Sequence, residues 1–240
     1  MKDRIPSLSV EQMREVDRLM VKEFQIKLIQ MMENAGYALA ALARERFLAG
    51  DPRGSRVMIL SGSGGNGGGG LAAGRRLLTW GAEVFIFLTR KPEDMAGIPA
   101  HQLSILQNMQ EAAIIPPGED VDLPAAHLIL DALIGYSLQG APRGHAARLI
   151  RQVNEHNAPI LSLDVPSGIQ AGTGHIHTPS VAADATLTLA LPKKGLLREG
   201  VRPHVGELYL ADIGVPPELY NLLDIAVGPI FAAEDILRVY

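Results

Sequence analysis

The sequence has 240 residues, a formal net charge of −4 at pH 7 and no cysteine. The lack of cysteine excludes disulfides and thiolate metal sites, and the acidic balance argues against a nucleic acid or an anionic membrane as the main partner. The N-terminus has no apolar signal region, and no apolar stretch reaches the roughly 20 residues that span a bilayer. These features predict a globular cytoplasmic protein.

Two amphipathic helices are expected at the start of the chain. Ser9 and Gln12 have the spacing of a capping box, which predicts a first helix that ends near Lys22. Apolar residues at intervals of three and four predict a second helix over residues 26–44. Gly36 lowers the helix propensity of that segment, so it is expected to permit a close contact.

Short apolar strands then alternate with helices. The strands are expected at 56–61, 83–88, 112–115, 128–131, 160–164, 186–190 and 207–211, and the helices at 71–79, 100–109 and 145–156. Apolar runs without polar alternation indicate a parallel sheet that is covered on both faces, and therefore an α/β protein. In such sheets ligands bind beyond the carboxyl ends of the strands, so the segments that follow the strands are the candidate sites.

Seven of the 25 glycines lie between Gly62 and Gly70, directly after the first expected strand. Gly62, Gly64 and Gly67 have the G-x-G-x-x-G spacing that brings backbone amides close to a pyrophosphate. The second strand does not end in the acidic residue of an NAD site, whereas Arg90 could meet a 2′-phosphate. A phosphate or nucleotide ligand is favoured, with an NADP-dependent oxidoreductase and a purely structural turn as alternatives.

Polar residues end three of the other expected strands. Asp131 and Asp164 each close an apolar strand, where an ionised carboxylate is costly unless it is solvated, paired or bound to a cation. Helix capping is the structural alternative for both. Asn66, Asp131 and Ser167 together offer oxygen ligands for a hard cation. Lys193 is a third site candidate, with a solvated surface lysine as the alternative.

Several separated motifs resemble, in order, those of the YjeF N-terminal domain family. They are Glu11–Asp17, Met32–Gly36, the glycine segment, Asp131–Gly135, Leu163–Gly168, Pro192–Lys193 and Ala211–Gly214. The resemblance implies a Rossmann-like three-layer α/β/α sandwich with a mostly parallel central sheet over residues 1–214. Residues 215–240 would be a tail or the start of a linker to a second domain.

The same resemblance implies an isomerase, an NAD(P)H-hydrate epimerase that interconverts the R and S forms of hydrated NADH and NADPH. Such an enzyme would be a homodimer and would act beside a separate or fused dehydratase. A potassium ion would be held by Asn66, Asp131 and Ser167. The expected substrate contacts are Gly65, Asn66, Gly67, Gly68, Gly69, Gly135, Tyr136, Ser137, Leu138, Gln139, Gly140, Ala141 and Asp164.

Catalysis is assigned to Asp164, which would protonate the departing hydroxyl group and take a proton from the incoming water. Lys193 would tune the charge state of Asp164. The glycine segment departs from the family pattern, which is similar to N-N-G-G-D-G, because Gly65 and Gly69 replace an Asn and an Asp. Two polar substrate contacts are therefore absent, and a catalytically degenerate nucleotide-binding or protein-interaction module is the alternative function.

Overall fold

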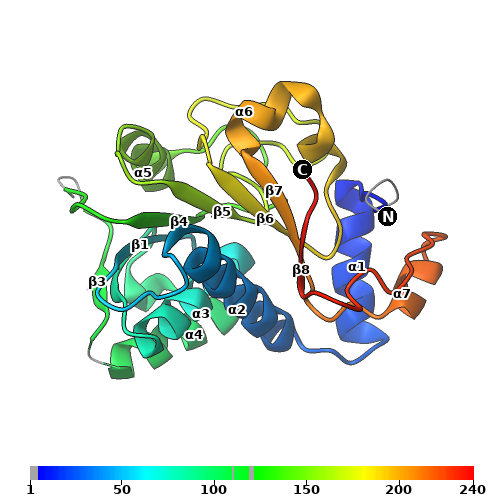
Figure 1. The fold of residues 1–240 in the computed structure, drawn as a ribbon, viewed down its shortest axis with the longest axis horizontal. Helices are drawn as coiled ribbons and strands as arrows, with labels where there is room; N and C mark the ends of the chain where they lie inside the picture. Colours follow the sequence, from blue (N-terminus) through cyan, green and yellow to red (C-terminus); the bar gives the residue numbers. More distant parts are fainter. Residues whose placement is uncertain (1–4, 110, 119–121) are drawn as a thin grey trace.

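One eight-stranded sheet organises the protein in the computed structural model, which describes residues 5–109, 111–118 and 122–240 (Figure 1). The strand order is β3-β2-β1-β4-β5-β6-β7-β8. The strands are β1 Arg56–Ser61, β2 Glu83–Leu88, β3 Ala113–Ile115, β4 Leu128–Ala132, β5 Ile160–Leu163, β6 Ala185–Leu189, β7 Glu207–Ala211 and β8 Ile236–Arg238. Neighbouring strands are parallel throughout β1–β7, and only β8 is antiparallel, to β7. The predicted mostly parallel sheet is confirmed.

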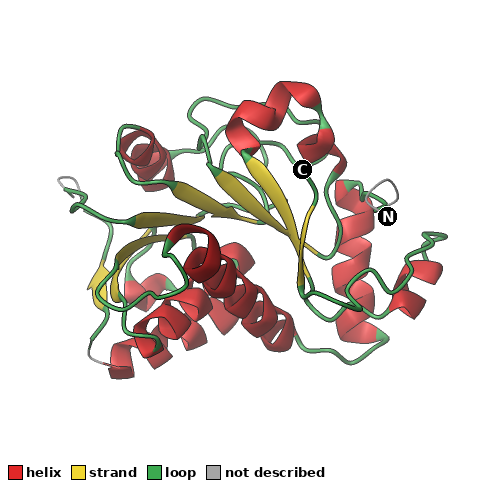
Figure 2. Ribbon diagram, in the orientation of Figure 1, coloured by secondary structure: helices red, strands yellow, loops and turns green. Residues whose placement is uncertain are grey.

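Helices cover both faces of this sheet, as Figure 2 shows. Helices α2, α3 and α4 lie on one face, and α5 and α6 on the other (Figure 1). The helices are α1 Val10–Lys22, α2 Leu28–Phe47, α3 Gly65–Thr79, α4 Gly97–Met109, α5 Gly144–Asn154, α6 Arg202–Val205 and α7 Pro217–Asn221; Pro92–Asp94, Lys194–Leu197 and Glu199–Val201 form single 3-10 turns. The three-layer arrangement expected from the sequence is therefore present.

Helix α1 begins with the predicted capping box. The Gln12 amide donates to the Ser9 hydroxyl oxygen at 3.2 Å, and the Ser9 amide donates to the Gln12 side chain at 2.9 Å. These two bonds satisfy backbone groups that a helix start otherwise leaves open. The apolar stripe of Met13, Val16 and Met20 is buried, whereas Arg14 and Arg18 are exposed and Asp17 is half-buried.

Helix α3 starts at Gly65, six residues before the predicted start at Leu71. The glycine segment is thus mostly the first turns of a helix and not a loop. A Cβ atom at Gly68 would lie 2.3 Å from the Met32 sulfur, and one at Gly70 would lie 2.5 Å from the Ala132 Cβ. The missing side chains let α3 pack tightly between α2 and β4, and this packing offsets the weak helix propensity of glycine.

The close contact expected at Gly36 is also present. A Cβ atom added there would lie 2.5 Å from the Ala72 Cβ and 2.9 Å from the Gly69 carbonyl oxygen. Helices α2 and α3 therefore approach each other through small residues on both sides. This approach places the start of α3 directly beside α2, at the carboxyl edge of the sheet.

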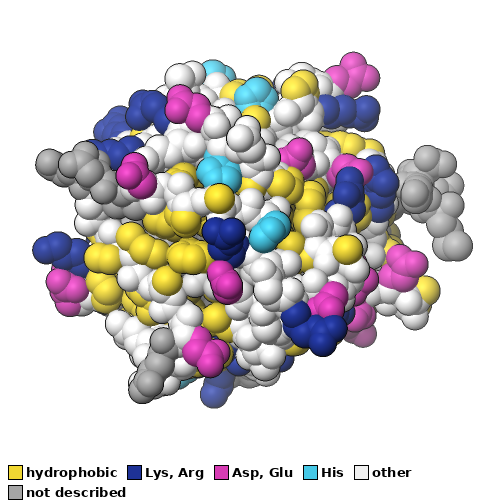
Figure 3. Space-filling view, turned by 60° about the vertical axis from the view of Figure 1, so that its left-hand side comes forward, with side chains coloured by type: hydrophobic (Ala, Val, Ile, Leu, Met, Phe, Trp, Pro, Cys, Tyr) yellow, Lys and Arg dark blue, Asp and Glu magenta, His cyan; other side chains and the backbone are white. Residues whose placement is uncertain are grey.

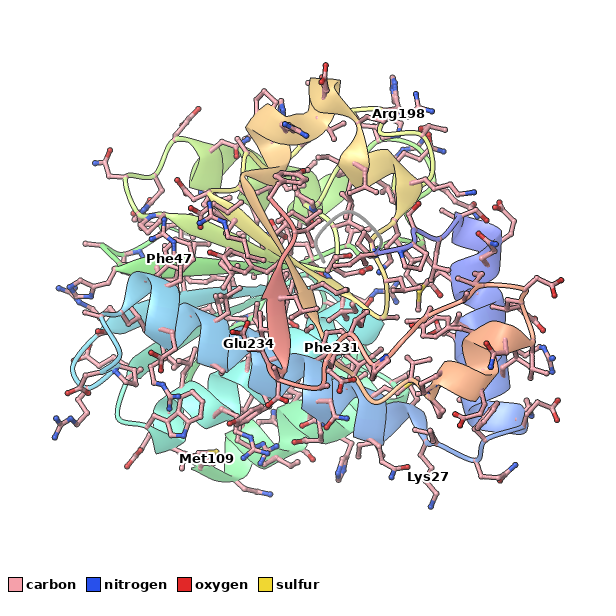
Figure 4. All side chains as sticks on the ribbon, turned by 45° about the vertical axis from the view of Figure 1, so that its right-hand side comes forward. Lys27, Phe47, Met109, Arg198, Phe231 and Glu234 are labelled. Atoms are coloured by element: carbon pink, nitrogen blue, oxygen red, sulfur yellow. The ribbon has the colours of Figure 1, made fainter. Side chains whose placement is uncertain are left out.

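Residues 215–240, expected as a tail or linker, pack against the sheet. Leu219 and Tyr220 are buried in a cluster with side chains of α1 and β7, and β8 pairs with β7. Phe231 and Glu234 lie near the beginning of β8 (Figure 4). Whether a domain ends at residue 214 stays a prediction, but the segment after it belongs to the same packed unit in this structure.

The surface carries charge of both signs. On the face drawn in Figure 3, basic and acidic side chains are interspersed around apolar areas. No helix among the described residues is long and apolar enough to cross a membrane. Several of the buried polar and charged side chains lie together at the ends of β4, β5 and β6.

Candidate active site

A cavity of about 280 Å³ opens at the carboxyl edge of the sheet. Helices α1 and α2 and the first turn of α3 form part of its wall, and the ends of β5 and β6 with the segments after β4, β5, β6 and β7 form the rest. Its lining residues are Met13, Asp17, Leu28, Met31, Met32, Ala35, Gly65, Asn66, Gly69, Gly135, Tyr136, Ser137, Leu163, Asp164, Leu189, Lys193 and Ile213. The cavity thus lies where the parallel sheet predicts a ligand site.

Asp164 and Lys193 form a buried ion pair in this cavity. The Lys193 ammonium is fully buried; it donates to the Asp164 carboxylate, to the Leu189 carbonyl oxygen at 2.9 Å and to the Thr188 hydroxyl at 3.3 Å. The alternative that Lys193 is a solvated surface residue is therefore wrong. A buried charge pair of this kind needs good geometry to offset its desolvation, and three partners on one ammonium provide it.

The backbone at Asp164 is held in an uncommon conformation. Its φ angle is +66°, and the Val165 amide donates to the Leu163 carbonyl oxygen at 2.8 Å. A hydrogen bond between residues i+2 and i, around a central residue with positive φ, is the rarer and more strained form of γ-turn. Such strain in a residue other than glycine is typical of functional positions. The turn directs the carboxylate of Asp164 into the cavity.

Tyr136 joins Asp164 to a second carboxyl group that the sequence analysis missed. The Tyr136 amide donates to Asp164 Oδ2 at 2.9 Å, and the Tyr136 hydroxyl donates to Asp17 Oδ2. Burial raises the pKa of Asp17, against the hydrogen bond from Tyr136 and the charge of Lys193, while the charge of Asp164 adds to the rise. Burial and the neighbouring Asp17 also raise the pKa of Tyr136.

Asp131 and Ser167 lie together below the cavity. The fully buried Asp131 carboxylate accepts the Ser167 hydroxyl at 2.6 Å, the Ser167 amide at 2.8 Å and the Ser162 hydroxyl at 2.8 Å. Burial raises the pKa of Asp131, and these hydrogen bonds act against the rise. None of the ion pairs in the described part of the chain includes Asp131, so its charge is met only by neutral donors.

Asn66 lies on the first turn of α3, next to Gly135. A Cβ atom at Gly135 would lie 3.3 Å from Asn66 Oδ1 and 3.0 Å from Asp164 Oδ2, so a side chain there would crowd both groups. The side-chain nitrogen of Asn66 is buried and has no partner among the described residues. The Ile134 amide donates to the Ser167 hydroxyl at 2.9 Å. The segment 134–135 therefore connects Asn66 with the Asp131–Ser167 pair.

These oxygen ligands are of the type that a hard cation prefers. The described residues contain no group of three or more His, Asp or Glu side chains that could hold a metal ion. Asp131, Ser167 and Asn66 instead offer one carboxylate with neutral hydroxyl and amide oxygens, the ligand type that hard cations prefer. The fully buried carboxylate of Asp131, which accepts hydrogen bonds only from neutral groups, is the observation that favours a cation here.

The expected substrate contacts divide into two groups. Seven of them line the cavity, namely Gly65, Asn66, Gly69, Gly135, Tyr136, Ser137 and Asp164. Gly67 and Gly68 face inward instead, because added Cβ atoms would strike the Gly62 carbonyl oxygen and the Met32 sulfur. Leu138, Gln139, Gly140 and Ala141 continue the segment after β4 at the surface, outside the lining of the cavity.

A larger cavity, of about 370 Å³, lies beside the first, and Ile213 lines both. It is formed by Ala190 and by the segment 212–232 after β7, and among the described residues Asp212 is the only charged one in its lining. The Tyr220 hydroxyl is buried there without a partner among the described residues. Because acid–base chemistry needs several titratable groups in reach of one another, the smaller cavity with Asp17, Asp164 and Lys193 is the better candidate for the active site.

Comparisons with known proteins bear on the identity of this site. Residues 28–195 match the family model described as YjeF-related protein N-terminus. A protein of Dehalogenimonas lykanthroporepellens named NAD(P)H-hydrate epimerase is 46% identical over 219 residues, covering 90% of this chain and 85% of that protein. A protein of Moorella thermoacetica named bifunctional NAD(P)H-hydrate repair enzyme Nnr is 38% identical over 218 residues, which are 88% of this chain and 41% of that protein.

The fold also has a counterpart among solved structures. The crystal structure of the yeast protein ynu0, YNL200c, superimposes with a TM-score of 0.82 over 98% of this chain and 100% of that chain, at 24% identity. This likeness concerns the fold, whereas the match over residues 28–195 and the 46% identity concern the sequence itself. On these grounds the chain belongs to the YjeF-related protein N-terminus family.

Proposed function

We propose that this protein is an NAD(P)H-hydrate epimerase, an isomerase that interconverts the R and S forms of hydrated NADH and NADPH. The observation that carries the proposal is the buried Asp164–Lys193 pair in a cavity at the carboxyl edge of the sheet. It is supported by the name of the Dehalogenimonas relative, of which this chain covers 85%. Arg90, on which an NADP-dependent oxidoreductase would depend, is not among the residues that line this cavity.

The chemistry of the substrate explains why a carboxylate is needed. Hydrated nicotinamide is a carbinolamine, whose ring nitrogen can expel the hydroxyl group and leave a planar carbon. Re-addition of water to the opposite face then gives the other epimer. Each half of this reaction moves a proton to or from oxygen, and general acid–base groups accelerate such steps by about 10²–10⁴-fold. Asp164 is the group that we assign to the proton of the incoming water, with Lys193 holding its charge.

We assign a potassium ion to Asn66, Asp131 and Ser167. When bound, such an ion supplies positive charge beside the buried Asp131 carboxylate and beside the glycine segment. The protein would hold it through the oxygens described above. The substrate would then contact the residues that line the cavity, from Gly65 to Asp164.

Gly65 and Gly69 are the positions at which the alternative of a catalytically degenerate module arises. A Cβ atom at Gly65 would have no neighbour within 4 Å, and one at Gly69 would lie 2.8 Å from a methyl group of Leu163. Both positions line the cavity, so the polar side chains that the family pattern has there would face the substrate. Asp164 and Lys193, to which we assign the proton transfer, form a buried pair in the cavity, and on this ground we favour an active enzyme over a binding module.

The decisive experiment uses purified R-form hydrate of NADPH and a dehydratase that accepts only the S form. If this protein is an epimerase, the R form is consumed when both proteins are present. A stable R form together with measurable nucleotide binding would support the degenerate module instead. Gly65→Asn and Gly69→Asp, singly and together, measure whether the two glycines limit the rate.

The potassium assignment has a test that does not depend on activity. The midpoint of thermal unfolding should be higher in KCl than in NaCl at equal ionic strength, because an ion that binds only the folded state stabilises it. Asp131→Asn should remove this difference. Equal midpoints in the two salts would contradict the assignment.

The substrate suggests one partner. Epimerisation is useful where a dehydratase repairs only one epimer, so we propose that this protein acts beside such an enzyme. The proposals that it is a homodimer and cytoplasmic rest on the family resemblance and the composition of the chain. This chain corresponds to 41% of the bifunctional Moorella relative. The dehydratase could therefore be a fused domain or a separate protein.

A further inference from the structure

The cavity holds a second carboxyl group, that of Asp17, besides the one assigned to acid–base chemistry. Asp17 lines the cavity from α1, although it is distant in sequence from every other polar residue of the site. Only Tyr136 bonds to its side chain among the described residues. The groups that act on it electrostatically are Tyr136, Lys193 and Asp164. A half-buried carboxyl group that faces a ligand cavity is a functional-site candidate on physical grounds.

Tyr136 holds the two carboxyl groups apart. Its backbone amide bonds to Asp164 Oδ2, while its phenol bonds to Asp17 Oδ2, so one tyrosine stands between them. The Lys193 ammonium lies 6.0 Å from the centre of the same ring. The two carboxyl groups thus reach the cavity from different elements, α1 and the turn after β5, and do not contact each other directly.

Inversion at a planar carbon needs this kind of arrangement. The hydroxyl group must leave, as water, from one face of the ring and water must add to the other, and one carboxyl group cannot reach both faces at once. Glycoside hydrolases that invert an oxocarbenium-like carbon solve the same problem with two carboxyl groups about 6.5–9.5 Å apart, one acid and one base. The carbon of a carbinolamine passes through a comparable cation, in which nitrogen replaces oxygen.

We propose that Asp17 is a second catalytic acid–base group, which serves the ring face opposite to Asp164, and that Tyr136 positions it. The proposal rests on the epimerase function given above. In one direction, the proton of Asp17 passes to the departing hydroxyl group as the C–O bond breaks, and water leaves. The nitrogen lone pair forms a C=N bond. Water then bonds to the carbon from the Asp164 side, the C=N electrons return to nitrogen, and Asp164 takes the proton.

The reverse direction exchanges the two roles, and solvent restores the protons between turnovers. The different surroundings of the two groups suit this division. Asp164 is ion-paired with Lys193 and so begins as the base. Asp17 has no cationic partner among its hydrogen bonds, and burial raises its pKa, which favours the protonated acid. When one carboxyl group is ion-paired and a second, nearby one is not, the first is suited to act as the base and the second as the acid.

The test compares Asp17→Asn and Tyr136→Phe with Glu15→Gln as a matched control. Glu15 lies on the same helix but pairs with Arg18 at the surface. Each variant is assayed for inversion of the R-form hydrate with the S-specific dehydratase, for incorporation of ¹⁸O from labelled water into each epimer, and for binding of NADP⁺. Unfolding midpoints verify that the variants are folded.

Asp17→Asn is expected to lower the rate of inversion by about 10²-fold or more. Its affinity for NADP⁺ should stay within about threefold of wild type, because the lost group acts in the transition state and not in ground-state binding. One epimer should still exchange its oxygen with retention, because Asp164 still serves its own face. Tyr136→Phe should slow inversion less, and Glu15→Gln should not change it.

Two outcomes would overturn the assignment while leaving the epimerase in place. One is inversion by Asp17→Asn at the wild-type rate. The other is loss of inversion and exchange together with intact binding, which would indicate a structural role. If the wild-type protein itself does not invert the hydrate, the proposed function fails, and the assignment of Asp17 fails with it.

Discussion

Replacing Lys193 by Met tests whether the buried ion pair has the energetic role that its geometry implies. The variant keeps most of the side-chain volume but removes an ammonium that bonds to Asp164, Thr188 and the Leu189 carbonyl oxygen. Because Asp164 is 4% exposed, its charge would stay buried without a counterion. Removal of one partner from a buried pair costs about 3–5 kcal/mol. For a chain of this size that lowers the unfolding midpoint by about 6–20 °C.

The assay is urea unfolding of the single variant, of Asp164→Asn and of the double variant. Asn at position 164 still accepts the hydrogen bond from the Tyr136 amide, so the double variant should recover most of the loss. About 1–2 kcal/mol should remain for the Leu189 carbonyl oxygen that has lost its donor. The exposed neighbour Lys194 provides the control, Lys194→Met. Additive losses in the double variant, or a single variant as stable as wild type, would refute the reasoning.

Two further predictions concern the glycine segment and the sheet edge. Gly65→Ala should stabilise the protein by about 0.5–1 kcal/mol, since its Cβ meets open space at the start of a helix. Gly67→Ala should destabilise it by about 3 kcal/mol or more, because its Cβ would lie 1.8 Å from the Gly62 carbonyl oxygen; equal urea midpoints for the pair would contradict this. Hydrogen bonds from Arg46 and Tyr209 lower the pKa of Glu207 to about 2, against a usual 4.5. Its contribution is therefore present above pH 4.5 and is lost as the pH falls toward 2, so the thermal midpoints of wild type and Glu207→Gln should differ at pH 7 and converge in acid; a constant difference would count against it.

Strands β1 to β7 were predictable because burial on both faces leaves, for most of them, an unambiguous apolar run. The expected range 56–61 coincides with β1, and the range 83–88 coincides with β2. The start of α3 was not predictable, because glycine propensity argues against a helix and only the tertiary contacts with Met32 and Ala132 reverse that preference. β8 was missed for a similar reason, since its pairing with β7 is a long-range contact in a segment without strand periodicity.

The positions of Asp131 and Asp164 in the candidate site were predictable because both residues lie at strand ends. Asp17 could not be recognised in this way, because an acidic residue on an amphipathic helix usually faces solvent. One signal was available: Asp17 follows Val16 and lies one turn after Met13, which places it beside the buried stripe. Its partner Tyr136 is separated by 119 positions, and no sequence pattern connects the two.

The γ-turn at Asp164 limits which residues this position accepts without conformational strain. A left-handed backbone suits glycine best, so the fold alone would select glycine there, and every other residue is held against a conformational preference. Asp164→Gly should therefore be tolerated by the backbone while it removes the carboxylate. In a population of related chains, a glycine at this position would mark a protein released from its chemistry, and a carboxylate would mark one still under selection for it.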